Sequence, residues 1–244
     1  MYAPFLSVVI PVFNEQSRIV ETLDQVLEYL GSQHYSWEVV VVDDGSTDRT
    51  SSLVQHLIEN RPNTHLRHLR LCHKGKGWAV KQGMLHALGE YRFMCDADLS
   101  MTIEQITRFL PPQANNYDVA VGSREVLGAR KIGEPRMRKM MGRVFSQMVR
   151  ALALPGMVDT QCGFKCFHAT AAETLFGEQL LHGFAFDVEI LFLARKRGLR
   201  VIEVPIDWYY SAQSKVRPVR DAVSMLKDTL RIRWHYLRGL YGAD

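Results

Sequence analysis

Two runs of consecutive apolar residues constrain the fold of this chain more than any other feature. Residues 8–10 are Val-Val-Ile and residues 39–42 are Val-Val-Val-Val, with no alternation between apolar and polar positions. Strands of that kind are buried on both faces, as in parallel sheets that carry helices on either side. We therefore expect both runs to be central strands of an α/β domain.

The first 125 residues alternate strand-like runs with longer helical patterns, which is typical of a mostly parallel central sheet with helices on both faces. Helical periodicity after residue 125 predicts a further helix and a final amphipathic helix, with one strand between them. The expected strands are 6–12, 38–43, 66–71, 91–95, 118–122 and 201–204. The expected helices are 19–30, 53–58, 78–88, one that begins at the capping-box sequence 102–105, 186–198 and 219–240.

No internal repeat and no linker rich in Gly, Ser or Pro divides the 244 residues. We expect a single domain over 1–244, with a first half at 1–125, a second half at 126–215 and an amphipathic helix at 216–244.

Acidic side chains follow the predicted strands at the point where each strand ends. Glu15 follows the first strand, Asp44 the second, and Asp96 and Asp98 the fourth. The carboxyl ends of parallel strands form the ligand-binding edge of such a sheet. We therefore expect these four carboxylates to gather at one edge of the sheet, where they would repel each other unless a cation or hydrogen-bond donors separate them. Carboxylate oxygens are ligands that Mg²⁺ and Mn²⁺ prefer, although aspartate pairs are also common in turns.

The net charge of +4 is unevenly distributed along the chain. Residues 128–150 carry a net charge of +6 and residues 215–238 carry +5, so the remainder carries −7. Two basic segments on an acidic body indicate an anionic partner, although solvated helix faces would have the same composition. Met and Leu interleave with the basic residues in place of aromatic stacking platforms, which argues against nucleic acid and favours an anionic membrane surface. Packing of these apolar faces into the core is the competing interpretation.

The same composition bears on localisation. No run approaches the ~18 consecutive apolar residues of a membrane span, and the N-terminus lacks the features of a signal peptide. We therefore expect a cytoplasmic protein, peripheral at the membrane. The four cysteines form no CxxC pair and lie among apolar neighbours, so we expect packed, reduced thiols and neither a zinc site nor a disulfide.

Several motifs together resemble those of family-2 glycosyltransferases of the GT-A fold. The resemblance rests on residues 7–15, 42–48, 76–77 and 96–98. Later motifs, at 122–124, 159–165, 186–189 and 214–215, resemble polyprenyl-phosphate glycosyltransferases. Among these, residues 160–165, Thr-Gln-Cys-Gly-Phe-Lys, are most similar to the dolichyl-phosphate β-glucosyltransferase branch.

The resemblance implies that residues 1–125 bind the nucleotide sugar and that residues 126–215 bind the acceptor, and it implies roles for individual residues. The nucleotide-sugar group is Pro11, Phe13, Glu15, Asp44, Lys76, Asp96 and Ala97. Asp98 and Asp96 would hold a divalent cation, Mg²⁺ or Mn²⁺, and Asp98 would act in catalysis as its main ligand. Asp187 would orient the sugar or assist as a base, with Glu189 as a weaker candidate. The acceptor phosphate would contact Arg124, Lys165 and Lys215. Some mannosyl-transferring relatives have a metal-binding Gln where this chain has Ser100, which argues against mannose as the donor sugar.

The implied reaction is an inverting transfer of a hexose, glucose being favoured, from a nucleoside-diphosphate sugar, UDP-glucose being favoured, to a polyprenyl or dolichyl phosphate. Two alternatives remain open. One is a GDP-mannose-dependent polyprenyl-phosphate mannosyltransferase. The other, from a different functional class, is a catalytically silent module that binds sugar nucleotides or nucleic acid.

Overall fold

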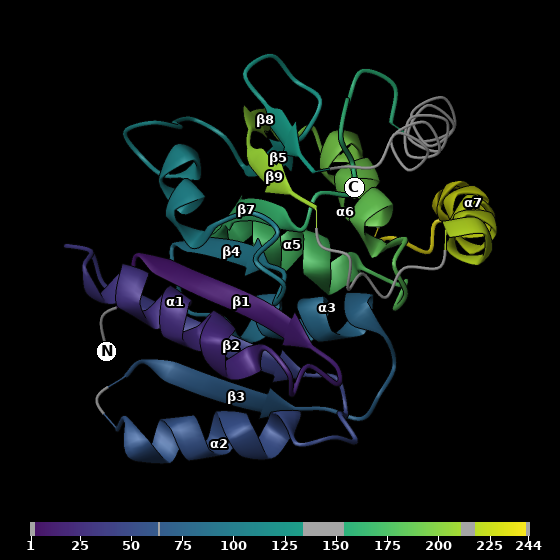
Figure 1. Ribbon diagram of the computed structural model, residues 1–244. Coiled ribbons are helices and arrows are strands. Elements are labelled where there is room, and N and C mark those ends of the chain that lie inside the picture. The colour runs from purple at the N-terminus through teal and green to yellow at the C-terminus, as the bar shows by residue number, and fades with distance from the viewer. Residues whose placement is uncertain (1–2, 63, 134–153, 211–217, 243–244) are drawn as a thin grey trace.

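A seven-stranded sheet runs through the middle of the molecule in the computed structural model, which describes residues 3–62, 64–133, 154–210 and 218–242 (Figure 1). Its strands are β1 (Leu6–Val12), β2 (Trp37–Asp43), β3 (Leu66–Arg70), β4 (Tyr91–Cys95), β5 (Val119–Ser123), β7 (Phe164–His168) and β8 (Val201–Pro205). Their order in space is β3-β2-β1-β4-β7-β5-β8. The strand pairs of this sheet are parallel except for the two that involve β7. The expected mostly parallel sheet is confirmed.

Helices cover both faces of this sheet. One face carries α1 (Ile19–Gly31), α2 (Thr50–Asn60) and a 3₁₀ helix, η1 (Ile103–Phe109). The other carries α3 (Lys76–His86), α5 (Ala169–Glu178) and α6 (Phe186–Lys196), with α7 (Pro218–Leu237) packed outside α6 at the edge of the molecule (Figure 1).

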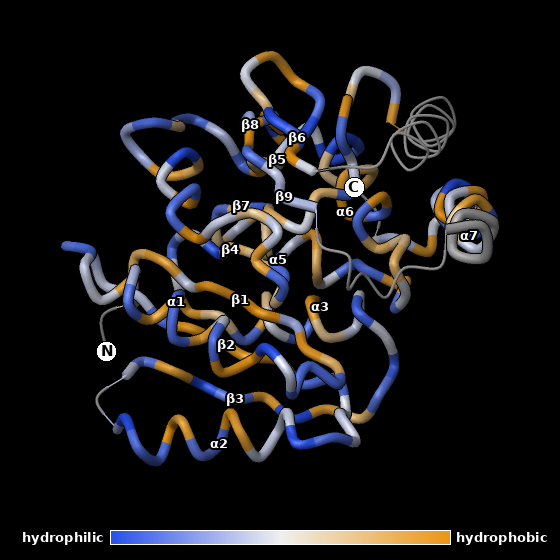
Figure 2. The backbone as a smooth tube through the Cα atoms, viewed as in Figure 1, coloured by the Kyte–Doolittle hydropathy of each residue, from blue (hydrophilic) through white to orange (hydrophobic). Residues whose placement is uncertain are grey.

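The central strands are buried on both sides, as their continuous apolar sequences predict. Val8 and Ile10 of β1 pack into one hydrophobic cluster with Leu23 of α1, whereas Val9 points to the other face and packs with Val80 of α3. Figure 2 shows the resulting band of apolar backbone through β1 and β2, with hydrophilic segments outside it. Burial on two faces is what fixes the position of this sheet between its helices.

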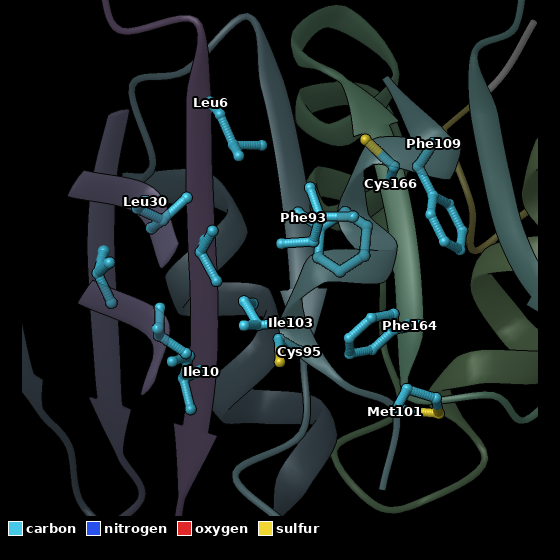
Figure 3. Close-up of a cluster of buried hydrophobic side chains, with 14 of the residues drawn as sticks. Leu6, Ile10, Leu30, Phe93, Cys95, Met101, Ile103, Phe109, Phe164 and Cys166 are labelled. Atoms are coloured by element: carbon cyan, nitrogen blue, oxygen red, sulfur yellow. The ribbon is translucent and has the colours of Figure 1, made fainter. Parts of the chain in front are cut away.

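Aromatic contacts join the two halves of the chain within one of these clusters (Figure 3). The ring of Phe93 on β4 meets Phe109 of η1 at 5.1 Å and Phe164 of β7 at 4.9 Å, both edge to face. This arrangement is favoured between aromatic rings. It holds β7 next to β4 and so places the segment before β7 beside the end of β4.

The largest difference from the sequence-based expectation is β7. Register pairs Lys165 with Met94 of β4 and with Val121 of β5, both antiparallel. A lysine in the second position hides the strand from any apolar pattern, and the following helix α5 was not expected either. A separate two-stranded sheet, β6 (Arg130–Ile132) with β9 (Asp207–Tyr209), was also not predicted.

Three local expectations are corrected by the structure. The capping-box segment opens a 3₁₀ helix in which Thr102 makes no side-chain cap, because Gln105 instead donates to and accepts from the backbone of Asp207. The predicted helix 78–88 lies at Lys76–His86. Cys72 is exposed, whereas the other three cysteines are buried as expected.

Both basic segments extend beyond the described residues. Most of the first, 134–150, and the beginning of the second, 215–217 with Lys215, lie outside them. Within the described part of the chain, no helix is long and apolar enough to cross a membrane.

Candidate functional site

The carboxylate pair after β4 differs in exposure. Asp96 is partly buried and its Oδ1 lies 2.7 Å from the Nζ of Lys76. Asp98 is exposed, and its Oδ1 accepts a hydrogen bond of 3.0 Å from the backbone N–H of Ser100. Leu99, which follows Asp98, has a φ of +43°, a value that is typical of a tight turn. The turn leaves Asp98 as the carboxylate that is open to solvent.

Lys76 is brought to Asp96 by the start of α3. Gly75, directly before it, has a φ of +118°, and a Cβ there would lie 2.6 Å from the carbonyl oxygen of His182. The backbone is therefore in a conformation and a space that only glycine fits. Burial alone lowers the pKa of Lys76, but the carboxylates of Asp96, Asp187 and Asp98 outweigh it and hold that pKa above its ordinary value.

Asp44 anchors the loop that leads to Lys76. Its carboxylate is almost fully buried and accepts hydrogen bonds from the backbone N–H groups of Lys74, at 3.0 Å, and Gly75, at 2.9 Å. Nδ1 of His73 lies 2.7 Å from the same carboxylate, and the His73 ring stacks on Phe13 at 4.2 Å. The predicted nucleotide-sugar residues Phe13, Asp44 and Lys76 therefore belong to one connected loop region.

Glu15 lies in the turn after β1. Its carboxylate pairs with Arg18 at 3.0 Å, and its backbone N–H donates to Oγ1 of Thr50. Pro11 lies within β1 and Ala97 is buried between the two aspartates, where its carbonyl oxygen accepts a hydrogen bond from Thr22.

The four carboxylates do not converge as closely as the sequence suggested. Glu15, Asp44 and Asp96 each have basic partners of their own, as described above. Within the described ranges, no three His, Cys, Asp or Glu side chains are grouped so as to hold a metal ion. The expected common cluster around one cation is therefore reduced to the neighbouring pair of Asp96 and Asp98.

Asp187 and Glu189, two residues apart on α6, lie in different surroundings. Oδ1 of Asp187 accepts a 2.6 Å hydrogen bond from the buried ammonium group of Lys165. Burial raises the pKa of Asp187, although Lys165 and Lys76 act in the opposite direction. Glu189 instead accepts from Tyr241 and from the N–H groups of the 180–181 segment. Only Asp187 of the two faces the charged residues beside Asp96.

The predicted phosphate contacts also have internal partners. Arg124 makes a bidentate pair with Asp159, at 2.6 and 2.9 Å, and remains about one quarter exposed. Lys165 is 1% exposed, so its ammonium group is not presented to a substrate and the structure does not support the expected phosphate contact. Lys215 lies outside the described residues.

Sequence reasoning missed two supporting features of the site. Glu203 on β8 accepts hydrogen bonds from the N–H groups of Val158 and Asp159 and so fixes the carboxylate that holds Arg124. Gly163 packs against Asp96, since a Cβ at 163 would lie 2.0 Å from Oδ2 of that residue. The polar Glu203 within an apolar strand was a usable signal, whereas nothing in the sequence marked the contact of Gly163.

Solved structures share this fold. Glucosyl-3-phosphoglycerate synthase from Mycobacterium tuberculosis, solved with Mn²⁺, uridine diphosphate and glucosyl-3-phosphoglycerate, aligns with a TM-score of 0.67 at 18% identity over 99% of this chain and 81% of that one. The same synthase with uridine diphosphate alone aligns with the same TM-score over 94% of this chain. The fold is GT-A-like, and the match of a glycosyl transferase sequence model makes the class a glycosyltransferase.

Comparison of sequences narrows the class to a family. The sequence model of glycosyl transferase family 2 matches residues 7–176. A dolichyl-phosphate beta-glucosyltransferase from Dictyostelium discoideum is 35% identical over 97% of this chain and 76% of its own length. The Saccharomyces cerevisiae enzyme of that name is 34% identical over the same shares of the two chains. The chain belongs to glycosyl transferase family 2.

Proposed function

We propose that this enzyme transfers glucose from UDP-glucose to dolichyl phosphate or a related polyprenyl phosphate. The observation that carries the proposal is the similarity, at 34–35% identity over nearly the whole chain, to enzymes named dolichyl-phosphate beta-glucosyltransferase. The open carboxylate of Asp98 and the neighbouring Lys76–Asp96 pair supply groups suited to a sugar diphosphate.

The donor set suits Mg²⁺ or Mn²⁺. Both are hard cations that take oxygen ligands and accept water and substrate phosphates in the rest of their coordination shell. Asp98, which is exposed, and Asp96, which already faces a cation, are the residues that would hold such an ion. When bound, the ion would neutralise the charge that grows on the leaving diphosphate. The M. tuberculosis synthase with a similar fold was solved with Mn²⁺ and uridine diphosphate.

The acceptor needs positioning more than deprotonation. A phosphate monoester with a second pKa of about 6 is already largely dianionic at neutral pH. Its oxygen would attack the anomeric carbon while the nucleoside diphosphate leaves from the opposite face, which inverts the configuration. Arg124, fixed by Asp159 and partly exposed, is the described cation best suited to contact that phosphate. Lys215 remains a second candidate.

Asp187 completes the set of charged groups. Its carboxylate lies at the start of α6, beside Lys165 and Lys76. We assign it to orienting the sugar hydroxyls or Lys76, since the acceptor supplies its own negative charge.

A membrane surface is the proposed site of the reaction, at the cytosolic face. Leu230, Trp234 and Leu237 of α7 are exposed at spacings of four and three residues, which places them on one side of the helix. Arg238 stacks on Trp234 at 5.2 Å. Ile232 is buried in the hydrophobic cluster that contains α6, and Met225 is buried next to Gln161. One face of α7 thus packs in the core, and the other suits anionic lipid by shallow insertion and charge.

A transfer assay with radiolabelled sugar nucleotides tests the proposal. We expect glucose from UDP-glucose to reach dolichyl phosphate in the presence of Mn²⁺, and Asp98→Asn to lower the rate by at least a hundredfold with fold retained. Glu90→Gln is the matched control, because Glu90 is an exposed carboxylate at the opposite end of β4. Transfer from GDP-mannose alone would favour the mannosyl alternative, and unchanged transfer by Asp98→Asn would contradict the assigned role.

A further inference from the structure

Lys165 is a buried cation without a role in the proposed reaction. It lies on β7, and its register partners Met94 and Val121 place it in the middle of the sheet. Nζ donates to Oδ1 of Asp187 and to the carbonyl oxygen of Cys162, both at 2.6 Å. A buried ammonium group is costly unless it is paired and hydrogen-bonded, so its presence requires an explanation.

The hydrogen bond from Lys165 to Cys162 fixes the segment before β7. Because Nζ holds the carbonyl oxygen of Cys162, the next residue, Gly163, is held against the carboxylate of Asp96. The space there admits no side chain: a Cβ at 163 would stand 2.0 Å from Oδ2 and 2.5 Å from Cγ of Asp96. One oxygen of Asp96 thus faces Gly163 while the other pairs with Lys76.

The hydrogen bond from Lys165 to Asp187 belongs to a series of alternating positive and negative side chains. Lys165 pairs with Asp187 of α6, the carboxylate of Asp187 attracts Lys76 of α3, and Lys76 pairs with Asp96 after β4 at 2.7 Å. Asp187 is therefore paired with one ammonium group and attracted electrostatically to a second one from another element. Without the charge of Lys165, the attraction between Asp187 and Lys76 would no longer be balanced, and Asp187 would compete with Asp96 for Lys76.

We propose that Lys165 is a positioning residue: its buried ammonium group balances Asp187 and holds the turn at Gly163, so that Lys76 and Asp96 stay paired where the sugar donor binds. The proposal rests on the proposed function, because it takes the Asp96 region as the donor site. It replaces the phosphate contact expected from the sequence with an indirect role in donor binding.

A double-mutant cycle on Lys165 and Asp187 tests the proposal. The constant to measure is the Kd of UDP-glucose with Mn²⁺ by titration calorimetry, for the wild type, Lys165→Met, Asp187→Asn and the double variant. We expect Lys165→Met to weaken binding at least tenfold, because the unbalanced Asp187 draws Lys76 away from Asp96. Asp187→Asn in that background should bring the affinity back to that of Asp187→Asn alone, since no charge is left to balance.

The alternatives give different results. Unchanged donor affinity in Lys165→Met, together with a raised KM for dolichyl phosphate, would overturn the proposal in favour of a phosphate contact. Additive effects of the two substitutions would overturn it as well. If Lys165→Met does not fold, the double variant is compared with Asp187→Asn alone. The proposal then expects less than a threefold difference in Kd, and a larger loss would contradict it.

The proposed function fails separately. A wild-type enzyme that binds UDP-glucose but transfers no glucose would contradict the proposed function. The Kd values of the double-mutant cycle could still be compared in that case. Normal transfer with additive binding effects would end the inference on Lys165 alone. Lys165→Arg, which keeps the charge, should retain more donor affinity than Lys165→Met, whereas a purely space-filling role predicts the reverse.

Discussion

Single residues in this site are defined by what surrounds them more than by their type. Asp96 and Asp98 are separated by one residue, yet one is confined between Lys76 and Gly163 and the other faces solvent. Confinement fixes the direction of the Asp96 carboxylate, and an oriented carboxylate loses little entropy on binding a ligand. Exposure of Asp98 leaves room for an ion that keeps its own water.

Gly163→Ala tests the confinement of Asp96. The added methyl group would lie 2.0 Å from Oδ2, so the carboxylate or the backbone must move. We expect at least a tenfold loss of kcat/KM for the sugar donor, with little change in KM for the lipid acceptor. Gly177→Ala is the control, because a Cβ at 177 meets nothing within 4 Å, and it should leave both constants unchanged. Equal activity of the two variants would contradict a tight contact at Gly163.

The sequence was informative about residues that lie at strand ends and uninformative about their partners. Asp96, Asp98 and Lys76 were expected at the site from the order of strands and motifs, and the structure brings Lys76 to Asp96. The sequence pattern did not predict which charged side chains are buried. Lys165 occupies a core position because Asp187, 22 residues later, provides a countercharge, and no local signal carries such a pairing.

Elements position these residues through helix geometry. Asp187 and Glu189 differ by about 200° around α6, since each residue turns an α-helix by about 100°. Hence one side of the helix start faces Lys165, and the other faces the 180–181 segment and Tyr241. The single Asp-Val-Glu sequence therefore serves two purposes, a charged site and the attachment of the chain after α7.

Tyr241→Phe tests that attachment. The Tyr241 hydroxyl donates to Glu189 at 2.7 Å, and both side chains are buried. A hydrogen bond to a charged group contributes about 2 kcal/mol, so we expect the free energy of unfolding at pH 7.5 to fall by about that amount. Tyr236→Phe, also near the end of α7 but exposed, should change it by less than about 0.5 kcal/mol.

The pH dependence of this loss has a definite sign. Burial raises the pKa of Glu189, and the Tyr241 hydrogen bond lowers it again in part. A carboxyl whose pKa is higher in the folded state than in the unfolded state stabilises the fold at pH values below its unfolded-state pKa of about 4.3. That contribution is lost as the pH rises through the pKa of the folded state. Because Tyr241 stabilises the ionised form, the deficit of Tyr241→Phe should shrink as pH falls toward 4.3. Denaturant titrations at several pH values measure it, and a constant deficit would contradict the assignment.

Among the elements, those with strong periodicity were predictable and those made by distant contacts were not. β1 and β4 have the bounds that their apolar runs predict. The antiparallel β7 forms because the aromatic cluster of Phe93 and Phe164 brings it to β4, and η1 departs from an α-helix where Gln105 binds Asp207. These contacts span tens of residues in the chain, beyond the reach of a local pattern.

At the scale of the whole molecule, the parallel strands give the protein two different ends. Their carboxyl ends carry Asp44, Asp96 and Asp98, and in Figure 1 the arrowheads of β1 and β3 point toward the side on which α7 lies. An acceptor whose phosphate lies at a bilayer surface would then reach the site from the α7 side. Under the proposed function, we therefore expect the exposed face of α7 to be the surface that faces lipid.

Substitution of that face provides the corresponding test. Trp234 is 51% exposed and Leu237 is 82% exposed, so Trp234→Gln with Leu237→Gln removes apolar surface without opening the core. We expect at least a tenfold loss of partitioning onto vesicles rich in phosphatidylserine, measured by flotation. The matched control, Leu85→Gln with Leu88→Gln, changes exposed leucines before the amino end of β4, away from α7, and should bind as the wild type does.

Salt separates the two forces at this surface. Screening shortens the reach of charge to about 3 Å at 1 M ionic strength, whereas apolar insertion persists. If the arginines of α7 and the basic segments provide most of the attraction, binding of the wild type should be strong at low salt and weak at high salt, with the glutamine double variant lower at both. Absence of wild-type binding at low salt would contradict membrane docking, and the lipid acceptor would then have to reach Asp96 and Asp98 by another route.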